Sequence, residues 1–125
     1  MVLDKRVILI EDEDFIRDLY KRQLDLAGFK TDAFGNGNEG LLSLSQNKYD
    51  LALLDIMLPG INGLEILKRI RQDEKNKDLA VILLTNLGQD SVIKEGLALG
   101  AKEYIIKASV TPDQIVATVK TILKI

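Results

Sequence analysis

The chain has 125 residues, with 17 basic and 19 acidic side chains, a formal net charge of −2 and 46% hydrophobic residues. This length and apolar content predict one domain, spanning residues 1–125, with a core of its own, and they exclude a disordered chain. Cysteine and histidine are both absent from the sequence. Disulfides, thiolate nucleophiles, histidine bases and zinc sites built on these residues are therefore excluded.

The charge distribution and the lengths of the apolar runs limit location and partners. Charged residues already occupy positions 4–6, and no apolar run exceeds about six residues, against ~20 for a membrane span. These features predict a cytoplasmic protein without a membrane partner. The slightly acidic balance, without a basic block, argues against direct binding of nucleic acid.

The first half of the chain alternates strand-like and helix-like patterns. A continuous apolar run at residues 7–10 predicts a strand buried on both faces. Residues 30–34 alternate with polar positions after a turn at Gly28, which predicts an edge strand. One helix is predicted before Gly28 and another after the turn at residues 35–37, because apolar residues recur there at helical spacing. These residues are Ile16, Leu19, Tyr20 and Ala27 in the first helix, and Leu41, Leu42 and Leu44 in the second.

The second half continues the alternation. Apolar runs at residues 51–54, 79–84 and 104–106 predict three further buried strands. Three helices follow these strands, and Thr111 and Gln114 predict a capping box at the start of the last one, with Pro112 at its first position. Their apolar stripes are Leu64, Leu67 and Ile70; Val92, Ile93, Leu97 and Leu99; and Ile115, Val119 and Ile122.

The resulting order is strand–helix five times. Such alternation predicts an α/β fold, a single doubly wound (βα)5 domain whose five-stranded parallel sheet has helices on both faces, because crossover connections are right-handed. Folds of this kind bind ligands outside the carboxyl ends of the strands, at the point where the strand order reverses. The residues that follow the strands are therefore the candidate site.

A polar residue ends each central apolar run. Glu11 and Asp12 follow the first strand, Asp55 follows the third, Thr85 the fourth and Lys107 the fifth. We expect all five side chains to meet at one edge of the sheet. Two carboxylates ~4 Å apart repel by about 4 kcal/mol at an effective dielectric constant of 20, so we expect the cluster to hold a cation or a proton.

The residue types at this edge favour phosphoryl chemistry. Oxygen ligands without histidine or cysteine favour Mg²⁺, or Mn²⁺, over zinc. A carboxylate beside such an ion can attack phosphorus and form an acyl phosphate. Thr85 and Lys107 would then contact the phosphoryl oxygens. Taken singly, each residue also has a simpler interpretation: helix capping for Glu11, Asp12 and Asp14, a turn for Asp55, a cap for Thr85, a surface charge for Lys107 and edge packing for Tyr104.

The whole chain resembles the receiver (CheY-like) domain of two-component response regulators. The motifs that carry the resemblance are VILIEDED at 7–14, YDLALLDIMLPG at 49–60, NG at 62–63, VILLT at 81–85 and GAKEYIIK at 100–107. The resemblance implies the flavodoxin-like strand order 2-1-3-4-5. It also implies a signalling switch, not an enzyme, with self-catalysed phosphorylation and dephosphorylation.

The resemblance also assigns roles to residues. Asp55 would accept a phosphoryl group from a phosphohistidine on a sensor histidine kinase or phosphotransfer protein. Asp12, Asp55 and the backbone carbonyl of Met57 would bind Mg²⁺, with Glu11 acting mainly through metal-bound water. Thr85 would hydrogen-bond the phosphoryl group and Lys107 would pair with it.

The switch and its partners are implied in the same way. Movement of Thr85 would couple to rotation of the Tyr104 ring. The fourth helix, fifth strand and fifth helix would form the partner surface, including that of a homodimer. The output would pass to an effector protein or to an output domain outside this chain, so the chain is either a stand-alone receiver or part of a longer regulator.

Two positions depart from the family pattern. Ala108 stands where proline normally follows the lysine, and Asn86 stands where a small residue normally follows the threonine. A cis bond before a non-proline residue costs ~3–4 kcal/mol, so we expect a trans Lys107–Ala108 peptide and a reshaped loop after it. Asn86 would either crowd the phosphoryl group or donate an amide hydrogen bond to it.

Three other functions compete with a phosphorylated switch. The departures at Ala108 and Asn86 keep open a degenerate receiver-like interaction module that acts without phosphorylation. A phosphatase of the haloacid dehalogenase type would carry a second aspartate two residues after the nucleophile, where this chain has Met57. A flavodoxin-like cofactor binder needs a phosphate cradle after the first strand, where residues 11–14 are all acidic.

Overall fold

The computed structural model describes residues 3–86 and 90–125. Residues 1–2, at the start of the expected domain, and the segment 87–89 lie outside the described residues. Within these ranges, no helix has the length and apolar character needed to cross a bilayer. The strands are β1 (Arg6–Ile10), β2 (Lys30–Phe34), β3 (Leu51–Asp55), β4 (Ala80–Thr85) and β5 (Glu103–Ile106). The helices are α1 (Asp14–Leu26), α2 (Gly37–Gln46), α3 (Gly63–Gln72), α4 (Asp90–Ala98), α5 (Pro112–Leu123) and the short 3₁₀ helix η1 (Lys107–Ser109).

The strands form one parallel sheet in the order β2-β1-β3-β4-β5, which confirms the predicted topology. The chain runs outward from β1 to the edge strand β2, then returns to pair β3 with the other side of β1. The strand order therefore reverses between β1 and β3. The residues just after these two strands lie at the position where doubly wound folds bind ligands.

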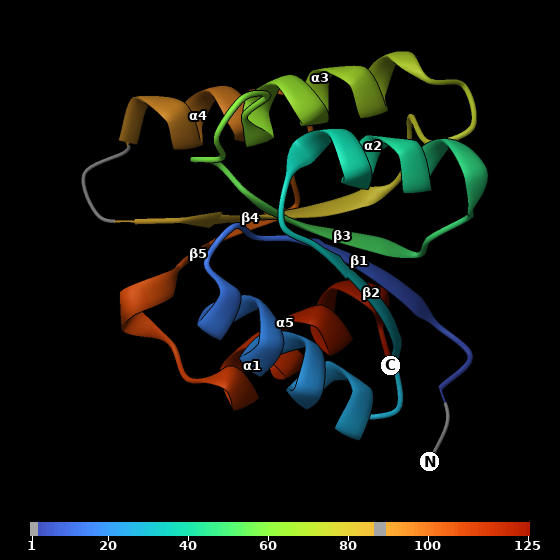
Figure 1. Ribbon diagram of the computed structural model, residues 1–125, viewed down its shortest axis with the longest axis vertical. Helices are drawn as coiled ribbons and strands as arrows, with labels where there is room; N and C mark the ends of the chain where they lie inside the picture. Colours follow the sequence, from blue (N-terminus) through green and yellow to red (C-terminus); the bar gives the residue numbers. More distant parts are fainter. Residues whose placement is uncertain (1–2, 87–89) are drawn as a thin grey trace.

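Helices cover both faces of the sheet (Figure 1). α2, α3 and α4 lie on one face, and α1 and α5 on the other. Side chains of β1 alternate between the two layers: Ile8 and Ile10 pack with the first group of helices, Val7 and Leu9 with the second. Burial on both faces explains why β1, β3 and β4 are continuous apolar runs instead of alternating ones.

Side chains cap three of the helices. The predicted capping box of α5 is present: the Thr111 hydroxyl accepts from the Gln114 amide, and the Gln114 side chain accepts from the Thr111 amide. Asn36 and Asn62 cap α2 and α3 through hydrogen bonds from the third helical residue. These two caps hold the loops that carry the chain from the carboxyl edge of the sheet into its helices.

The predicted apolar stripes of α2 and α4 are wrong at one residue each. Leu42 is 59% exposed and Leu97 is 41% exposed. Gly40 and Gly96 occupy the inward positions instead, because a Cβ at either glycine would overlap a core side chain, of Ile10 or Leu83 respectively. Glycine lets each helix approach the sheet closely. The face of each helix that meets the sheet is therefore not the face that its leucines alone predict.

Candidate functional site

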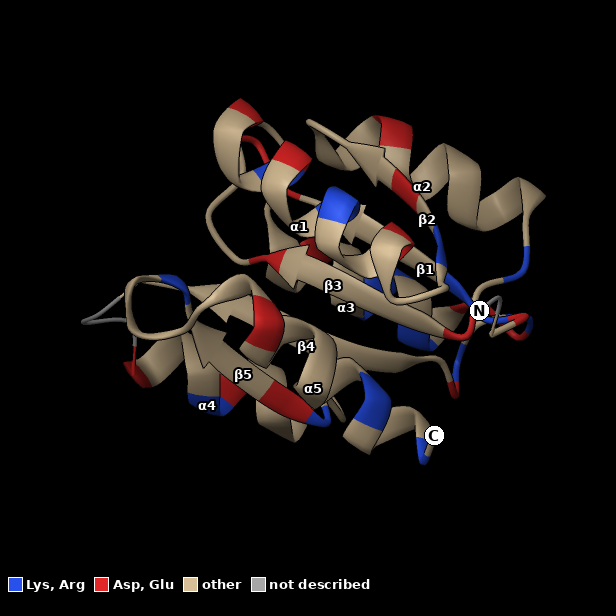
Figure 2. Ribbon diagram, turned by 90° about the horizontal axis from the view of Figure 1, so that it is seen from below, with Lys and Arg blue, Asp and Glu red and all other residues tan. Residues whose placement is uncertain are grey.

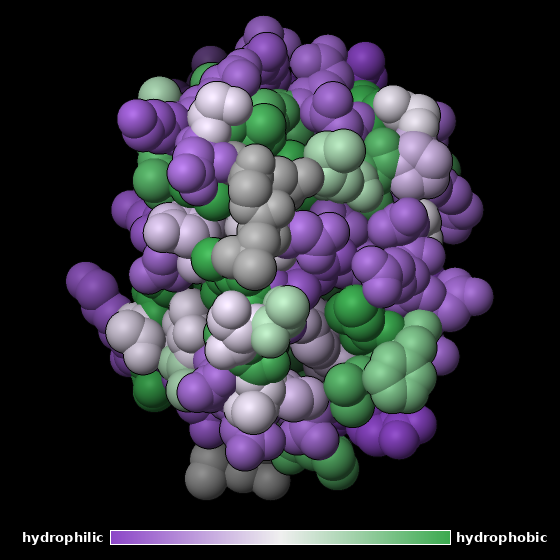
Figure 3. Space-filling model, turned by 90° about the vertical axis from the view of Figure 1, so that its left-hand side faces the viewer, coloured by the Kyte–Doolittle hydropathy of each residue, from purple (hydrophilic) through white to green (hydrophobic). Residues whose placement is uncertain are grey.

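The candidate residues lie at the carboxyl edge of the sheet. Glu11 and Asp12 directly follow β1, Asp55 ends β3, Thr85 ends β4, and Lys107 begins η1 directly after β5. The red arrowhead of β3 in Figure 2 marks the acidic end of that strand. Figure 3 views this side of the molecule and shows hydrophilic side chains gathered beside a smaller apolar area.

Three carboxylates converge as the strand order predicts. Carboxylate oxygens of Glu11, Asp12 and Asp55 lie within 4.8 Å of one another. Glu11 is 0% exposed and Asp55 is 1% exposed, whereas Asp12 is at the surface. At this separation two ionised groups repel by about 3 kcal/mol at an effective dielectric constant of 20. The pocket therefore favours any cation that reaches it.

Lys107 supplies one positive charge inside the cluster. Its Nζ lies 2.9 Å from Glu11 Oε1 and 3.1 Å from Asp55 Oδ2, and its side chain is 4% exposed. Glu13 Oε1 lies further away, at 3.6 Å from the same nitrogen. Lys107 is thus a buried bridging cation and not the surface charge of the simpler interpretation.

The segment after Lys107 has the expected backbone. The described residues contain no cis peptide bond, so the Lys107–Ala108 peptide is trans, as predicted. The chain then forms η1 before α5 begins. Lys107 therefore reaches Glu11 and Asp55 without the proline that normally follows this lysine in the family it resembles.

Backbone amides hold the other oxygens of the two buried carboxylates. Glu11 Oε2 accepts from the Glu13 amide at 3.0 Å, and Asp55 Oδ1 accepts from the Met57 amide at 3.0 Å. Glu11 thus also performs the capping role of the simpler interpretation, since Glu13 is the N-cap of α1 and its own side chain makes no cap bond. The Asp12 carboxylate makes no hydrogen bond or ion pair to the described residues, so it remains open for a ligand.

Burial and neighbouring charge shift the titration of the cluster. Burial first, and then the Glu11 charge, raise the pKa of Asp55 to about 7, against the opposing effect of Lys107. For Lys107, burial alone would lower the pKa. The hydrogen bond to Glu11 and the charge of Asp55 outweigh it, so the pKa of Lys107 is raised. Near neutral pH, Asp55 is therefore poised between its charged and neutral forms.

Thr85 and Tyr104 differ in their burial. Thr85 is 0% exposed, and its hydroxyl donates to the Asn86 carbonyl at 3.0 Å. Asn86 itself is exposed beside the end of β4. The Tyr104 side chain is 38% exposed on the edge strand β5, so edge packing does not bury its ring.

Two further residues shape the site and were not identified from the sequence. A Cβ at Gly63 would overlap the Asp55 carbonyl oxygen, so only glycine lets α3 begin against the end of β3. Arg17 Nη1 donates to the Glu11 carbonyl at 2.9 Å, which holds the loop that carries the acidic pair. In the sequence, Asn62-Gly63 stands out only as a motif of the family. The six-residue spacing of Arg17 from Glu11 does not predict their contact, because the contact depends on the turn between β1 and α1.

The donor set fits a hard divalent cation. The three converging groups are all carboxylates, and the chain has neither histidine nor cysteine. Oxygen-only sites of this kind suit Mg²⁺ or Mn²⁺. One cation with two charges, added to Lys107, would balance the three carboxylates of the cluster.

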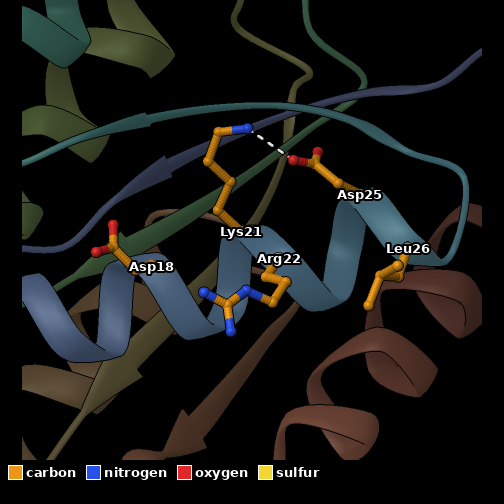
Figure 4. Close-up of a pocket in the computed structure, with 5 residues that line it drawn as sticks. All are labelled: Asp18, Lys21, Arg22, Asp25 and Leu26. Carbon is orange, nitrogen blue, oxygen red and sulfur yellow. Dashed lines mark hydrogen bonds and ion pairs between the residues drawn. The ribbon is translucent and has the colours of Figure 1, made fainter.

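A surface pocket on α1 is separate from this cluster. Figure 4 shows its lining residues, with Lys21 paired to Asp25 at 2.7 Å. Leu26 and the charged side chains of Asp18 and Arg22 complete the lining. None of the residues predicted for the site lines this pocket, so the converging carboxylates, and not the shape of the surface, identify the site.

Comparison with known proteins agrees with the geometry of this edge. A profile of the response regulator receiver domain matches residues 7–120. The phosphate regulon transcriptional regulatory protein PhoB of Rhizobium meliloti is 36% identical over 119 residues, which cover 95% of this chain and 52% of that protein. The chain thus spans about half the length of this curated relative.

Solved structures give the same result for the fold. A response regulator from Chloroflexus aurantiacus superposes with a TM-score of 0.88 at 30% identity, covering 97% of this chain and 98% of the other. The receiver domain of a Francisella response regulator superposes with a TM-score of 0.86 at 27% identity, again covering 97% and 98%.

Proposed function

The chain belongs to the response regulator receiver family, and on this premise we propose that it is a phosphorylation-controlled switch whose phosphoacceptor is Asp55. The observation that carries the proposal is the buried cluster of Glu11, Asp55 and Lys107 beside the exposed Asp12. Asp55, like Glu11, is held by both an amide and an ammonium group, and it is the carboxylate that ends β3. It is therefore oriented for attack on an incoming phosphorus atom.

The proposed cation ligands are residues of the same edge. Asp12, Asp55 and the Met57 carbonyl would bind Mg²⁺, or Mn²⁺, with Glu11 acting through metal-bound water. A cation held there would neutralise the carboxylates and the charge of the phosphoryl oxygens. Asp12 supports this assignment, because its carboxylate is exposed and makes no hydrogen bond or ion pair to the described residues.

Lys107 and Thr85 would act on the phosphoryl oxygens. The Lys107 ammonium bridges Glu11 and Asp55, so a small shift carries it toward a group bonded to Asp55. A phosphoryl group adds a charge of about −1.5 to −2 and three acceptor oxygens. Thr85 would reach these oxygens by turning its hydroxyl from the Asn86 carbonyl. Tyr104, on the neighbouring strand β5, is the proposed reporter of that movement.

The proposed donor is a phosphohistidine on a sensor histidine kinase or a phosphotransfer protein. The 125 residues contain no histidine, so the donor imidazole lies outside them. The output partner is an effector protein or an output domain beyond this receiver. The relatives that this chain matches are about twice its length, which supports the second of these. The α4, β5 and α5 surface is the proposed face for a homodimer.

A degenerate receiver that acts without phosphorylation is the second candidate. The observation that favours it is the Thr85 hydroxyl, which donates to the carbonyl of Asn86, the residue that departs from the family pattern. Retention of this bond would keep Thr85 away from a phosphoryl group. The module would then bind its partners in a single state.

Acetyl phosphate separates the two candidates. Incubation with acetyl phosphate and Mg²⁺, followed by intact-mass measurement, is expected to add one phosphoryl group to the wild-type chain. Asp55→Asn should gain none, whereas Asp18→Asn, which neutralises an exposed carboxylate on α1, should gain it normally. No mass gain in the wild type, so that it is indistinguishable from Asp55→Asn, would favour the degenerate module.

A further inference from the structure

An exposed methionine lies two residues after the proposed phosphoacceptor. Met57 is 57% exposed, whereas its neighbours Ile56 and Leu58 are 2% and 7% exposed. Its amide donates to Asp55 Oδ1 at 3.0 Å, so its backbone is fixed to the reacting carboxylate. The loop therefore buries the apolar residues on either side of position 57 and leaves a large thioether in solvent beside Asp55.

The sulfur content of the chain makes this position unusual. The chain has no cysteine and two methionines, and the other methionine is residue 1. Oxidants that react with sulfur therefore have one internal target, and that target lies at the candidate site. Thioethers in solvent are readily oxidised to the sulfoxide, a polar and chiral group that methionine sulfoxide reductases convert back.

We propose that Met57 is a reversible oxidation site through which hydroperoxides control how long the phosphoryl group stays on Asp55. In the modification, the Met57 sulfur attacks one oxygen of the hydroperoxide. The O–O bond breaks, the sulfur loses two electrons and gains one oxygen, and the other oxygen leaves as water or as an alcohol. No group elsewhere in the chain is consumed.

The consequence for Asp55 follows from polarity and rests on the proposed function. An apolar side chain at the rim of the site limits the water that can approach an acyl phosphate. The sulfoxide oxygen is a strong hydrogen-bond acceptor and would hold water at the same position. Oxidation should therefore speed hydrolysis of the acyl phosphate, and we expect its lifetime to fall at least threefold.

The experiment compares the full chain before and after treatment with hydrogen peroxide. Tryptic peptide 49–68 contains Met57 and reports its sulfoxide by mass, separately from residue 1. Both samples are then phosphorylated with acetyl phosphate and Mg²⁺, the small molecules are removed, and loss of the phosphoryl group is followed by intact mass. Met57→Leu is treated in parallel, and sulfoxide reductase is added to a portion of the oxidised wild type.

We expect ready oxidation of Met57, a shorter lifetime of the acyl phosphate after treatment, and recovery of that lifetime after reduction. The treated and untreated Met57→Leu samples should have equal lifetimes. An unchanged lifetime in fully oxidised wild type would overturn the inference, and so would oxidation of Met57 that is far slower than oxidation of free methionine. Failure of the untreated chain to accept a phosphoryl group would instead contradict the proposed function and, with it, the control of lifetime.

Discussion

The substitution Asp55→Asn should stabilise the metal-free protein. The amide has nearly the shape of the carboxylate but carries no charge, so it relieves repulsion with Glu11 and the cost of burying an ion. The pKa of Asp55 is raised from 3.8 to about 7, and this difference corresponds to about 4 kcal/mol. The rise is net of the opposing attraction of Lys107, which the variant also loses. We therefore expect the variant to be more stable than the wild type by about 4 kcal/mol above pH 7.

The sign of this effect gives it a pH dependence. Asp55 binds its proton more tightly in the folded chain than in the unfolded chain. Its ionisation therefore lowers the stability of the wild type as the pH rises from about 4 to about 7, by up to about 1.4 kcal/mol per unit. The variant lacks this loss. Its stability relative to wild type should rise over that range and stay level above it.

Urea unfolding in EDTA, measured at several values between pH 4 and 8, tests the reasoning. Asp18→Asn serves as the control, because it removes an exposed carboxylate outside the cluster and should change stability little at any pH. If Asp55→Asn were less stable than wild type at pH 8, the repulsion that we assign to the cluster would not exist. A difference independent of pH would show that Asp55 titrates normally.

Four further predictions concern the same edge. Lys107→Met should cost about 3 kcal/mol of stability in EDTA, because it leaves the 0% exposed Glu11 without its cation, and wild-type stability in urea would contradict that ion pair. Mg²⁺ should raise the melting temperature of the wild type but not of Asp12→Asn, and equal shifts would place the ion elsewhere. Gly63→Ala should lower stability in urea more than Gly96→Ala, because the added Cβ meets a backbone carbonyl at Gly63 but a flexible leucine side chain at Gly96. The reverse order would refute the contact of Gly63 with the Asp55 carbonyl. Phe15 is 78% exposed three residues after Asp12, where a protein donor would contact it. Phe15→Ala should therefore slow phosphoryl transfer from a protein donor but not from acetyl phosphate. Equal slowing of both reactions would assign Phe15 another role.

The buried strands β1, β3 and β4 and their ends were predictable because parallel strands in a two-sided sheet must be apolar along their length. The polar residue at which each run stops therefore marks the edge of the core, as Asp55 and Thr85 do. Because all strands run in one direction, residues far apart in sequence meet there. This logic placed Lys107 beside Glu11, 96 positions away. The prediction of a buried strand at residues 104–106 is wrong, because β5 is an edge strand and Tyr104 is exposed.

Positions where a helix backbone closely approaches its neighbour were not predictable from periodicity. Gly40 and Gly96 take the inward positions of their helices, so Leu42 and Leu97 face outward although their spacing fits a stripe. Gly63 is explained only by the carbonyl that it contacts. A glycine adds nothing to the apolar periodicity of a helix. The reason for glycine at these positions is visible only once the neighbouring strand is in place.

The most direct test of the account is to identify the residue that carries the phosphoryl group. The chain is treated with acetyl phosphate in the presence or absence of Mg²⁺, and the acyl phosphate is reduced with borohydride. Tandem mass spectrometry then reads tryptic peptides 7–17, which contains Asp12, and 49–68, which contains Asp50 and Asp55. We expect Asp55 alone to be converted to homoserine, and only when Mg²⁺ is present. Conversion at Asp50 or Asp12, or equal conversion at Asp55 without the ion, would contradict the assignment of Asp55 as the phosphoacceptor.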